Sequence, residues 1–271
     1  MKTKQIILII IILAAVITLF LVFRNFGKVK LDKPESIVYD PVSEKFLISN
    51  VGNGNIVAMD EQGSLSEFIS GEFDAPKGMI IQADKLYITD PNQIHVVKLS
   101  EAKIVESFYI EGAKGLNDIA IDEYGKLYIT DTIDNCVFVY DPTSKTQERL
   151  SSPLLQAPNG IIYDKPRWQM FIVNLSQHSP IISLNTRDKS FSIFKDTMYS
   201  DLDGIAIDDL GRIFFSSWKE NMIIEIPQEQ NRFVTNFKGY DGAADIYYHL
   251  PGNELLVPMF KHNKIERIPL D

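Results

Sequence analysis

The sequence lacks several residues and motifs on which enzyme sites are often built. It has a single cysteine, Cys136, so the chain forms no internal disulfide and has no zinc-knuckle spacing. It contains no serine nucleophile elbow, no phosphate-binding loop and no dinucleotide-binding fingerprint. These absences argue against the classes of enzyme that depend on those motifs.

Basic charge is scarce in most of the chain. The formal net charge is −9, and residues 1–34 carry six Lys or Arg and one Asp, which leaves −14 for the remainder. A nucleic-acid-binding surface needs a basic face that displaces counterions from phosphates, so we expect no nucleic-acid partner. The basic residues that follow the apolar segment described next indicate contact with anionic lipid headgroups.

One long apolar run lies near the beginning of the sequence. It extends from Ile6 to Phe23 and is broken only by Thr18; as a helix it spans about 27 Å of hydrocarbon. It ends in bulky residues before Arg24, unlike the small residues of a signal-peptide cleavage site. We therefore predict an uncleaved transmembrane helix within residues 1–24. Basic residues flank it on both sides, and we expect the large domain to be extracytoplasmic, as in most uncleaved single-pass anchors.

A short phrase recurs six times in the chain at intervals of 40 to 44 residues. It consists of a polar residue, a small residue and a β-branched apolar run, and it reads PESIVYD at Glu35, PKGMII at Lys77, LNDIAID at Asn117, PNGIIYD at Asn159, LDGIAID at Asp203 and AADIYYH at Ala244. Each repeat contains short alternating runs bounded by Gly, Asp, Asn or Pro, and no stretch beyond residue 34 has a helical period. The pattern predicts an all-β, six-bladed β-propeller over residues 34–271.

The last repeat supplies only three strand-like runs before Asp271. Residues 25–33, between the predicted anchor and the first blade, belong to no blade of their own. We predict that Phe26 to Leu31 within this linker supplies the missing outer strand and closes the ring, which would also cover an exposed sheet edge.

The first strand of each blade lines the channel of a propeller, so the six residues that begin the phrases gather near one end of the axis. Glu35 and Asp203 would lose hydration there unless a positive charge neutralises them. Together with Asn117 and Asn159 they form an oxygen-only set that suits a hard divalent cation, Ca²⁺ first, with Mg²⁺, Mn²⁺ or Zn²⁺ as alternatives. The other interpretation is that Asp, Asn and Gly precede these strands for backbone reasons alone.

Residues 34–271 resemble the family of senescence marker protein (regucalcin), gluconolactonase and luciferin-regenerating enzyme, which are six-bladed propellers. Members of this family hold a metal ion with a Glu in the first blade's opening phrase, an Asn in an NG phrase and an Asp in a DG phrase. The matching residues here are Glu35, Asn159 and Asp203. A further Asn in an ND phrase, which contacts metal or substrate in the family, matches Asn117.

The resemblance implies a metal-dependent hydrolase that acts on a small-molecule lactone or ester. In this mechanism Asp203 is the expected base, and Asn117 and Lys77 are expected to bind substrate. Two departures from the family pattern bear on the substrate. Gly115 stands where sugar lactonases carry an Arg that binds hydroxyl groups, and Lys77 stands where paraoxonase-like relatives have a histidine pair.

A binding function without catalysis is the alternative. The segment LNDIAIDEYGKLYITDTIDNCVFVYD also resembles NHL-repeat blades, which bind proteins or ligands. The sequence does not indicate a particular protein partner. His178, His262 and Trp218 lie on loops at the predicted metal end. A histidine or tryptophan at such a place is more often solvated surface or a cap of the rim than a functional group.

Overall fold

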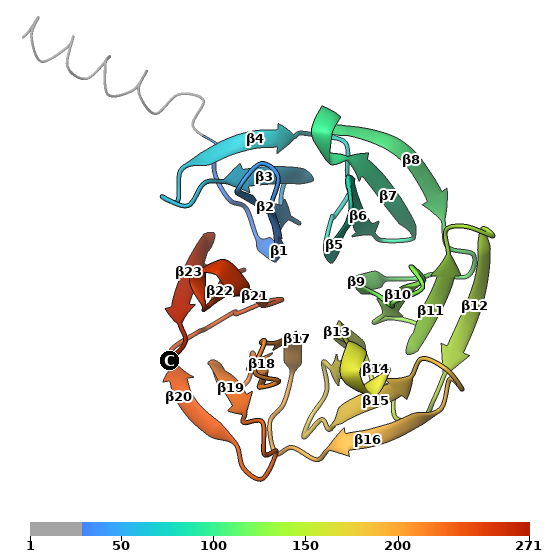
Figure 1. The fold of residues 1–271 in the computed structure, drawn as a ribbon, viewed down its shortest axis with the longest axis vertical. Helices are drawn as coiled ribbons and strands as arrows, with labels where there is room; N and C mark the ends of the chain where they lie inside the picture. Colours follow the sequence, from blue (N-terminus) through green and yellow to red (C-terminus); the bar gives the residue numbers. More distant parts are fainter. Residues whose placement is uncertain (1–28) are drawn as a thin grey trace, which may run out of the picture. The chain divides into compact units, whose positions relative to one another are not determined.

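Six antiparallel sheets surround a central axis, and the first strand of each sheet is the innermost (Figure 1). The computed structural model describes residues 29–271, and within them the chain from Leu31 to Asp271 forms one compact unit. Strands that follow one another in the sequence are also neighbours in each sheet. The prediction of an all-β, six-bladed propeller is therefore confirmed.

Five of these sheets have four strands and the last has three. The first three blades are β1 (Pro34–Asp40), β2 (Lys45–Asn50), β3 (Asn55–Met59) and β4 (Leu65–Ile69); β5 (Met79–Gln82), β6 (Lys85–Asp90), β7 (Gln93–Lys98) and β8 (Lys103–Tyr109); and β9 (Leu116–Ile121), β10 (Leu127–Asp131), β11 (Cys136–Asp141) and β12 (Thr146–Ser151).

The other three blades complete the ring (Figure 1). They are β13 (Pro158–Asp164), β14 (Gln169–Asn174), β15 (Ile181–Asn185) and β16 (Phe191–Lys195); β17 (Leu202–Ile207), β18 (Ile213–Ser217), β19 (Met222–Ile226) and β20 (Val234–Lys238); and β21 (Tyr247–His249), β22 (Glu254–Met259) and β23 (Lys264–Pro269). Single turns of 3-10 helix lie at η1 (Leu99–Glu101), η2 (Lys165–Arg167) and η3 (Leu250–Gly252).

The second and third strands of the blades are apolar on both faces because each blade packs between two others. β2 and β6, for example, are buried at every position except their first residue. Most of the buried apolar side chains of the described chain form five clusters, and each cluster joins two blades that are consecutive in the sequence. Stacking of neighbours thus removes both faces of each sheet from water.

The contact between the last and first blades is more polar than the other five. His249 lies 4.5 Å from the Tyr39 ring and 4.9 Å from the Phe46 ring, measured between ring centroids. Its Nδ1 atom is 3.2 Å from a Glu254 carboxylate oxygen, and the same carboxylate pairs with Arg267, which in turn reaches Glu61 of the first blade at 2.9 Å. Aromatic packing and the ion pair between Arg267 and Glu61 therefore close the ring.

The last blade lacks an outer strand, as the sequence predicts. Of the predicted closing segment, residues 26–28 lie outside the described residues, and residues 29–31 form no strand. Leu31 is nevertheless buried, and it lines a hollow with Ile265 and Arg267 of β23. The Lys33 amide donates to Asn263 Oδ1 at 2.8 Å, which places the chain beside the beginning of β23. Pairing of residues 26–31 with β23 stays a prediction.

The predicted membrane helix, Ile6 to Phe23, also lies outside the described residues. Within residues 29–271, no helix is long and apolar enough to cross a membrane.

Candidate functional site

Four predicted metal ligands occupy the same place in their blades. Glu35, Asn117, Asn159 and Asp203 are each the second residue of an innermost strand, namely β1, β9, β13 and β17. All four are buried, with at most 6% of their surface exposed. We call these four residues the axial set. Lys77 precedes β5 by two residues and is partly buried.

Hydroxyl groups between neighbouring blades fix the height of these residues along the axis. Thr130 of β10 donates to the carbonyl oxygen of Asn159 in the next blade at 2.7 Å, and it accepts the Asp118 amide of its own blade at 3.0 Å. Ser49 and Thr89 donate in the same way to the carbonyl oxygens of Lys77 and Asn117. Because each hydroxyl is buried and used, axial residues of adjacent blades are held side by side.

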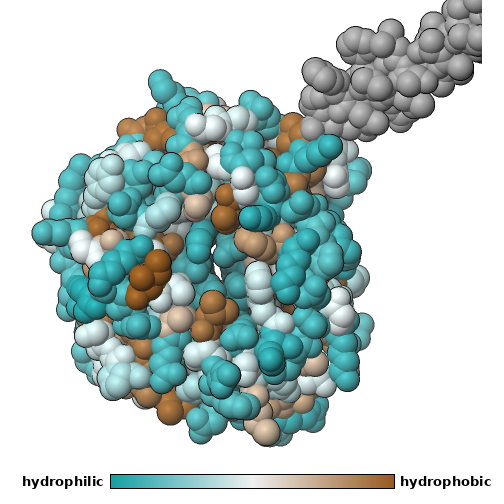
Figure 2. Space-filling model, turned by 180° about the vertical axis from the view of Figure 1, so that it is seen from behind, coloured by the Kyte–Doolittle hydropathy of each residue, from teal (hydrophilic) through white to brown (hydrophobic). Residues whose placement is uncertain are grey.

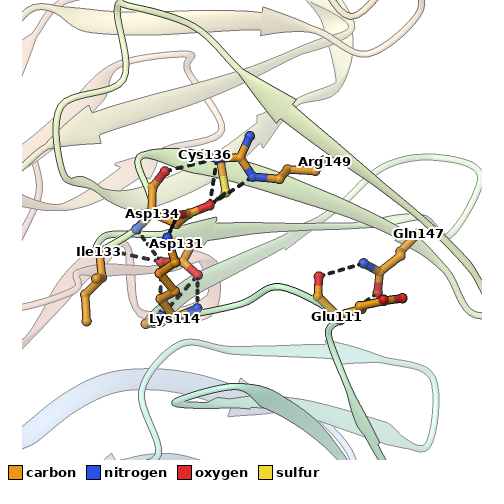
Figure 3. Close-up of polar contacts among 9 residues, drawn as sticks. Glu111, Lys114, Asp131, Ile133, Asp134, Cys136, Gln147 and Arg149 are labelled. Atoms are coloured by element: carbon orange, nitrogen blue, oxygen red, sulfur yellow. Dashed lines mark hydrogen bonds and ion pairs between the residues drawn. The ribbon is translucent and has the colours of Figure 1, made fainter.

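The turn that leads to Asn117 is held by Asp131, at the end of β10 (Figure 3). The Asp131 carboxylate accepts the backbone amides of Lys114 and Gly115 on one side, and those of Ile133 and Asp134 on the other. Asp134 in turn pairs with the side chains of Lys114 and Arg149, and these hydrogen bonds lower the pKa of Asp134 to about 2. Asp131 therefore has a structural role beside the axial set.

The side-chain amide of Asn117 has a defined orientation. Its nitrogen donates to Thr132 Oγ1 at 3.0 Å, and the Thr132 hydroxyl donates in turn to the Pro158 carbonyl oxygen at 2.7 Å. The amide oxygen is consequently the atom that faces away from Thr132. A neutral oxygen presented in this way can bind a cation or a substrate hydroxyl.

Burial dominates the electrostatics of the two axial carboxylates. Desolvation raises the pKa of Glu35, and the Lys77 ammonium partly offsets this. Desolvation also raises the pKa of Asp203 well above its ordinary value, and the negative charge of Glu35 raises it further. The two carboxylates are thus close enough to disfavour each other's ionised form, and Lys77 is close enough to favour both.

Asp203 carries an oxygen without a protein partner. Its Oδ1 atom is buried and accepts no hydrogen bond, and the Nε1 atom of Trp218 is likewise buried and donates none. Trp218 is near enough to lower the pKa of Asp203 slightly, but the two atoms do not meet hydrogen-bond geometry. A buried carboxylate oxygen without a partner is costly, and a cation at this place would satisfy it. The donors present therefore fit a hard divalent ion.

Two acidic residues that the sequence did not point to lie beside the axial set. Asp118 follows Asn117 and accepts the amides of Ile119 and Ile161, both at 2.7 Å. Burial nevertheless raises the pKa of Asp118 to about 7. Asp245 follows Ala244 and accepts the Ser36 hydroxyl at 2.8 Å, and burial together with the charge of Asp118 raises its pKa.

A sequence signal for these two residues did exist. The residue after the axial position is small in the other four blades, and the structure gives the reason for three of them. A Cβ atom at Gly78 would lie 2.6 Å from the Asp118 Cα, one at Gly160 would lie 2.4 Å from the Asp203 carbonyl oxygen, and one at Gly204 would lie 2.5 Å from the Asp245 Cα. Because the backbones of adjacent blades approach this closely, Asp118 and Asp245 are exceptions among the residues that follow the axial position.

A cavity of about 260 Å³ lies along the inner strands beyond the axial set. All six blades contribute to its lining, which is mostly isoleucine, and Asp118 and Asp245 are its two carboxylates. No member of the axial set lines this cavity. The central channel of the propeller thus has an apolar compartment that the sequence did not predict. Figure 2 shows a narrow gap at the centre of the propeller face turned away from Figure 1.

The structure does not contain a conventional acidic or histidine metal cluster. Among residues 29–271, no group of three or more His, Cys, Asp or Glu side chains is arranged to hold a metal ion. The axial set has only two carboxylates, and its other two donors are amides. His262 lies 3.4 Å from Asp241, and the His178 ring is 3.1 Å from the Met198 carbonyl oxygen, so both loop histidines already have partners.

The chain is similar to known proteins in sequence and in fold. A family model described as the SMP-30/Gluconolactonase/LRE-like region matches residues 33–237. No curated protein sequence matches the chain significantly.

Three solved structures illustrate the shared fold. A gluconolactonase from Xanthomonas campestris superposes with a TM-score of 0.71 at 13% identity, over 89% of this chain and 87% of that one. A calcium-binding protein, regucalcin, from Agrobacterium tumefaciens gives 0.70 at 13% identity, over 89% and 90%. Virginiamycin B lyase from Staphylococcus aureus gives 0.66 at 16% identity, over 90% and 87%. At these identities the likeness concerns the fold alone.

Proposed function

Because this chain belongs to the SMP-30/gluconolactonase/LRE-like family, we propose that it is a divalent-cation-dependent hydrolase of a lactone or ester. The observation that carries the proposal is the buried Asp203 Oδ1 atom, which has no protein partner and lies near the carboxylate of Glu35. Two desolvated carboxylates at one end of the axis lower stability unless a positive charge joins them.

The axial set would hold the cation, with two carboxylate and two amide oxygens and with water completing the shell. Ca²⁺ suits this set best, since it takes six to eight oxygen ligands in flexible geometry. A dedicated zinc site is disfavoured because the set contains neither His nor Cys. When bound there, a divalent cation supplies positive charge that polarises an ester carbonyl and lowers the pKa of water.

Asp203 is the residue that we assign as the base. Its Oδ1 atom is buried and accepts no hydrogen bond, which suits it to the cation, and we assign Oδ2 to take the proton of the attacking water. A carboxylate held beside a bound water can take its proton, and one positioned in this way typically contributes about 10² to 10⁴-fold in rate. Asn117 orients the substrate through its amide oxygen. Lys77, the cation nearest Glu35, binds the carboxylate that hydrolysis produces.

The test is turnover by the purified full-length protein. Acid release from a panel of lactones and esters is followed in a pH-stat with Ca²⁺ and again with a chelator. Asp203→Asn is expected to abolish turnover, by a factor of about 10² or more. Asp196→Asn changes an exposed carboxylate in the preceding loop and should leave the rate unchanged. Equal rates in Asp203→Asn and wild type would overturn the assignment.

We also propose that residues 1–24 anchor the protein in a membrane by a single span, with the propeller on the extracytoplasmic side. The apolar run from Ile6 to Phe23 supports the span. The orientation is the one that most uncleaved single-pass anchors adopt, because the basic residues on the two sides of the run nearly cancel. Protease added to sealed cells should digest the chain beyond residue 34. Full protection of that part would contradict the proposed orientation.

A second candidate, ligand binding without catalysis, is favoured by one observation. The cavity of about 260 Å³ is lined by all six blades, with Asp118 and Asp245 as its two carboxylates and no member of the axial set in its lining. Pockets with an apolar lining and a few convergent polar groups are typical of small-molecule binding. Cation binding without turnover on any substrate would support this candidate over the hydrolase.

A further inference from the structure

The residue that directly follows the second strand of each blade lies beside the axial set. In five blades its backbone amide donates to the residue two positions before the axial residue, for example from Leu175 to the Ala157 carbonyl oxygen at 2.8 Å and from Trp218 to that of Asp201 at 3.0 Å. We call the six residues at this position the rim; they are Val51, Pro91, Thr132, Leu175, Trp218 and Phe260.

The rim is in direct contact with the axial residues. Thr132 accepts the side-chain amide of Asn117, and the Trp218 indole is near enough to Asp203 to affect its pKa. A substrate whose carbonyl group reaches Asp203 must therefore place the rest of its body against rim side chains.

Five of the six rim residues are apolar, and none of the six is fully buried. Leu175 is 38% exposed. The rings of Trp218 and Phe260 pack with their centroids 5.6 Å apart, and the Lys261 ammonium lies 5.0 Å from the Trp218 centroid. The single hydroxyl of the rim, on Thr132, is already used twice. The rim thus offers apolar surface and little hydrogen-bonding capacity.

Ile133 extends this apolar surface over Gly115. A Cβ atom at position 115 would lie 2.6 Å from the Ile133 Cδ1 atom, so no side chain larger than hydrogen fits there while Ile133 keeps its place. Ile133 itself is 66% exposed, although large apolar side chains usually lie inside. Its exposed side chain therefore adds to the apolar surface next to Gly115, two residues before Asn117.

We propose that the substrate carries an alkyl or aryl group and is not a polyhydroxylated sugar lactone. This inference rests on the proposed hydrolase function. A hydroxyl-rich ring would exchange its hydrogen bonds to water for contacts with Leu175, Ile133 and Phe260, which cannot replace them. An alkyl chain would instead bury apolar surface against the same residues.

The experiment compares two lactones with the same six-membered ring. One is δ-decalactone, which bears a pentyl chain, and the other is glucono-δ-lactone, which bears hydroxyl groups. With the full-length protein and Ca²⁺, we expect kcat/KM for δ-decalactone to be at least about tenfold higher, since a single methylene can be worth that much. Leu175→Asn and Ile133→Asn should each remove most of this preference.

Leu210→Asn is the matched control. Leu210 is 55% exposed, but it lies in the turn between β17 and β18, at the opposite end of β17 from Asp203, so this change should leave the preference intact. Equal rates for the two lactones, or a preference for glucono-δ-lactone, would overturn the inference while leaving the hydrolase function in place.

A binding measurement separates the inference from the hydrolase function if neither lactone is turned over. The corresponding lactams, which resist hydrolysis, are titrated calorimetrically into the same protein. Tighter binding of the pentyl lactam, weakened at least about fivefold by Leu175→Asn, would support the apolar rim and contradict hydrolysis. Equal affinities for the two lactams, or tighter binding of the gluconolactam, would overturn the inference as well.

Discussion

Asp203 is the residue of the candidate site whose side chain is least satisfied by the protein itself. It is 4% exposed, it has an oxygen without a partner, and its pKa is raised by burial and by the charge of Glu35. A buried carboxylate of this kind lowers the stability of the fold, because only an opposite charge or good hydrogen bonds offset the loss of its hydration. A bound cation would supply that charge.

The positions of Asn117 and Asn159 each depend on a hydroxyl in the neighbouring blade, and Thr130 is the clearer case. Thr130→Val leaves the Asn159 carbonyl oxygen and the Asp118 amide without their buried partner. We expect the free energy of unfolding to fall by about 1–3 kcal/mol, measured by urea denaturation. Thr143→Val, in an exposed turn, serves as the control. A loss as small as that of the control would show that the hydroxyl bridge does not hold the blades together.

The sequence predicted the four members of the axial set, because each stands at the same place in a repeated phrase. It did not predict Asp118 and Asp245. The other four blades have Ser or Gly directly after the axial residue, so the two aspartates are visible in the sequence, but a pattern of apolar residues, which locates strands, does not draw attention to them. The close approach of neighbouring backbones explains why most blades have a small residue at this position.

At the scale of strands, the third repeat has the clearest signal in the sequence, since Gly, Asp and Asn separate the apolar runs that form β9 to β12. The two innermost strands that begin late, β5 at Met79 and β21 at Tyr247, belong to the blades whose axial residues are Lys77 and Ala244. These two blades contribute no oxygen donor to the axial set. Their irregular beginnings follow from local backbone geometry, which the apolar pattern does not encode.

Glu254 binds Arg267 and His249 of its own blade, the two residues that contact the first blade, and this gives a pH dependence. Hydrogen bonds from Arg267, assisted by His249, lower the pKa of Glu254 below its ordinary value. Its contribution to stability is therefore present above about pH 4.5 and is lost as the pH falls through the lowered pKa. We expect Glu254→Gln to cost about 1–2 kcal/mol at pH 7, a modest figure because Arg267 is partly exposed.

The measurement is urea unfolding of wild type and Glu254→Gln between pH 7 and pH 3. The difference in free energy between the two proteins should shrink as the pH falls. Glu266→Gln, which removes an exposed pair with Lys264 on the same strand, should show little effect at any pH. A difference that stays constant with pH would rule out an ionised Glu254 as the source of the stability.

The missing strand of the last blade gives a second prediction at this scale. If residues 26–31 pair with β23, replacing residues 25–30 by a Gly/Ser linker of equal length should lower the melting temperature by several degrees, at about 2–4 °C per kcal/mol for a chain of this size. Leu31 and Lys33 keep their contacts in this variant, so their loss cannot explain a change. An unchanged melting temperature would rule out the closing strand.

At the scale of the whole molecule, the propeller has two distinct compartments along its axis. The axial set and the rim lie at one end of the inner strands, and the isoleucine-lined cavity lies beyond them. The repeat length and strand count predicted the ring, because four strands in about 40 residues leave few other folds. The cavity could not be predicted, since its volume depends on how six separate strands pack around the axis.

Calcium titration calorimetry of the full-length protein tests the central claim most directly, because the hydrolase proposal requires a cation on the axial set. We expect one Ca²⁺ site in the wild type and in Asp196→Asn. Asp203→Asn and Glu35→Gln should each weaken it by at least about tenfold, the loss of one charged ligand being worth more than about 1.4 kcal/mol. Unchanged affinity in Asp203→Asn and Glu35→Gln, or no binding by the wild type, would contradict the account.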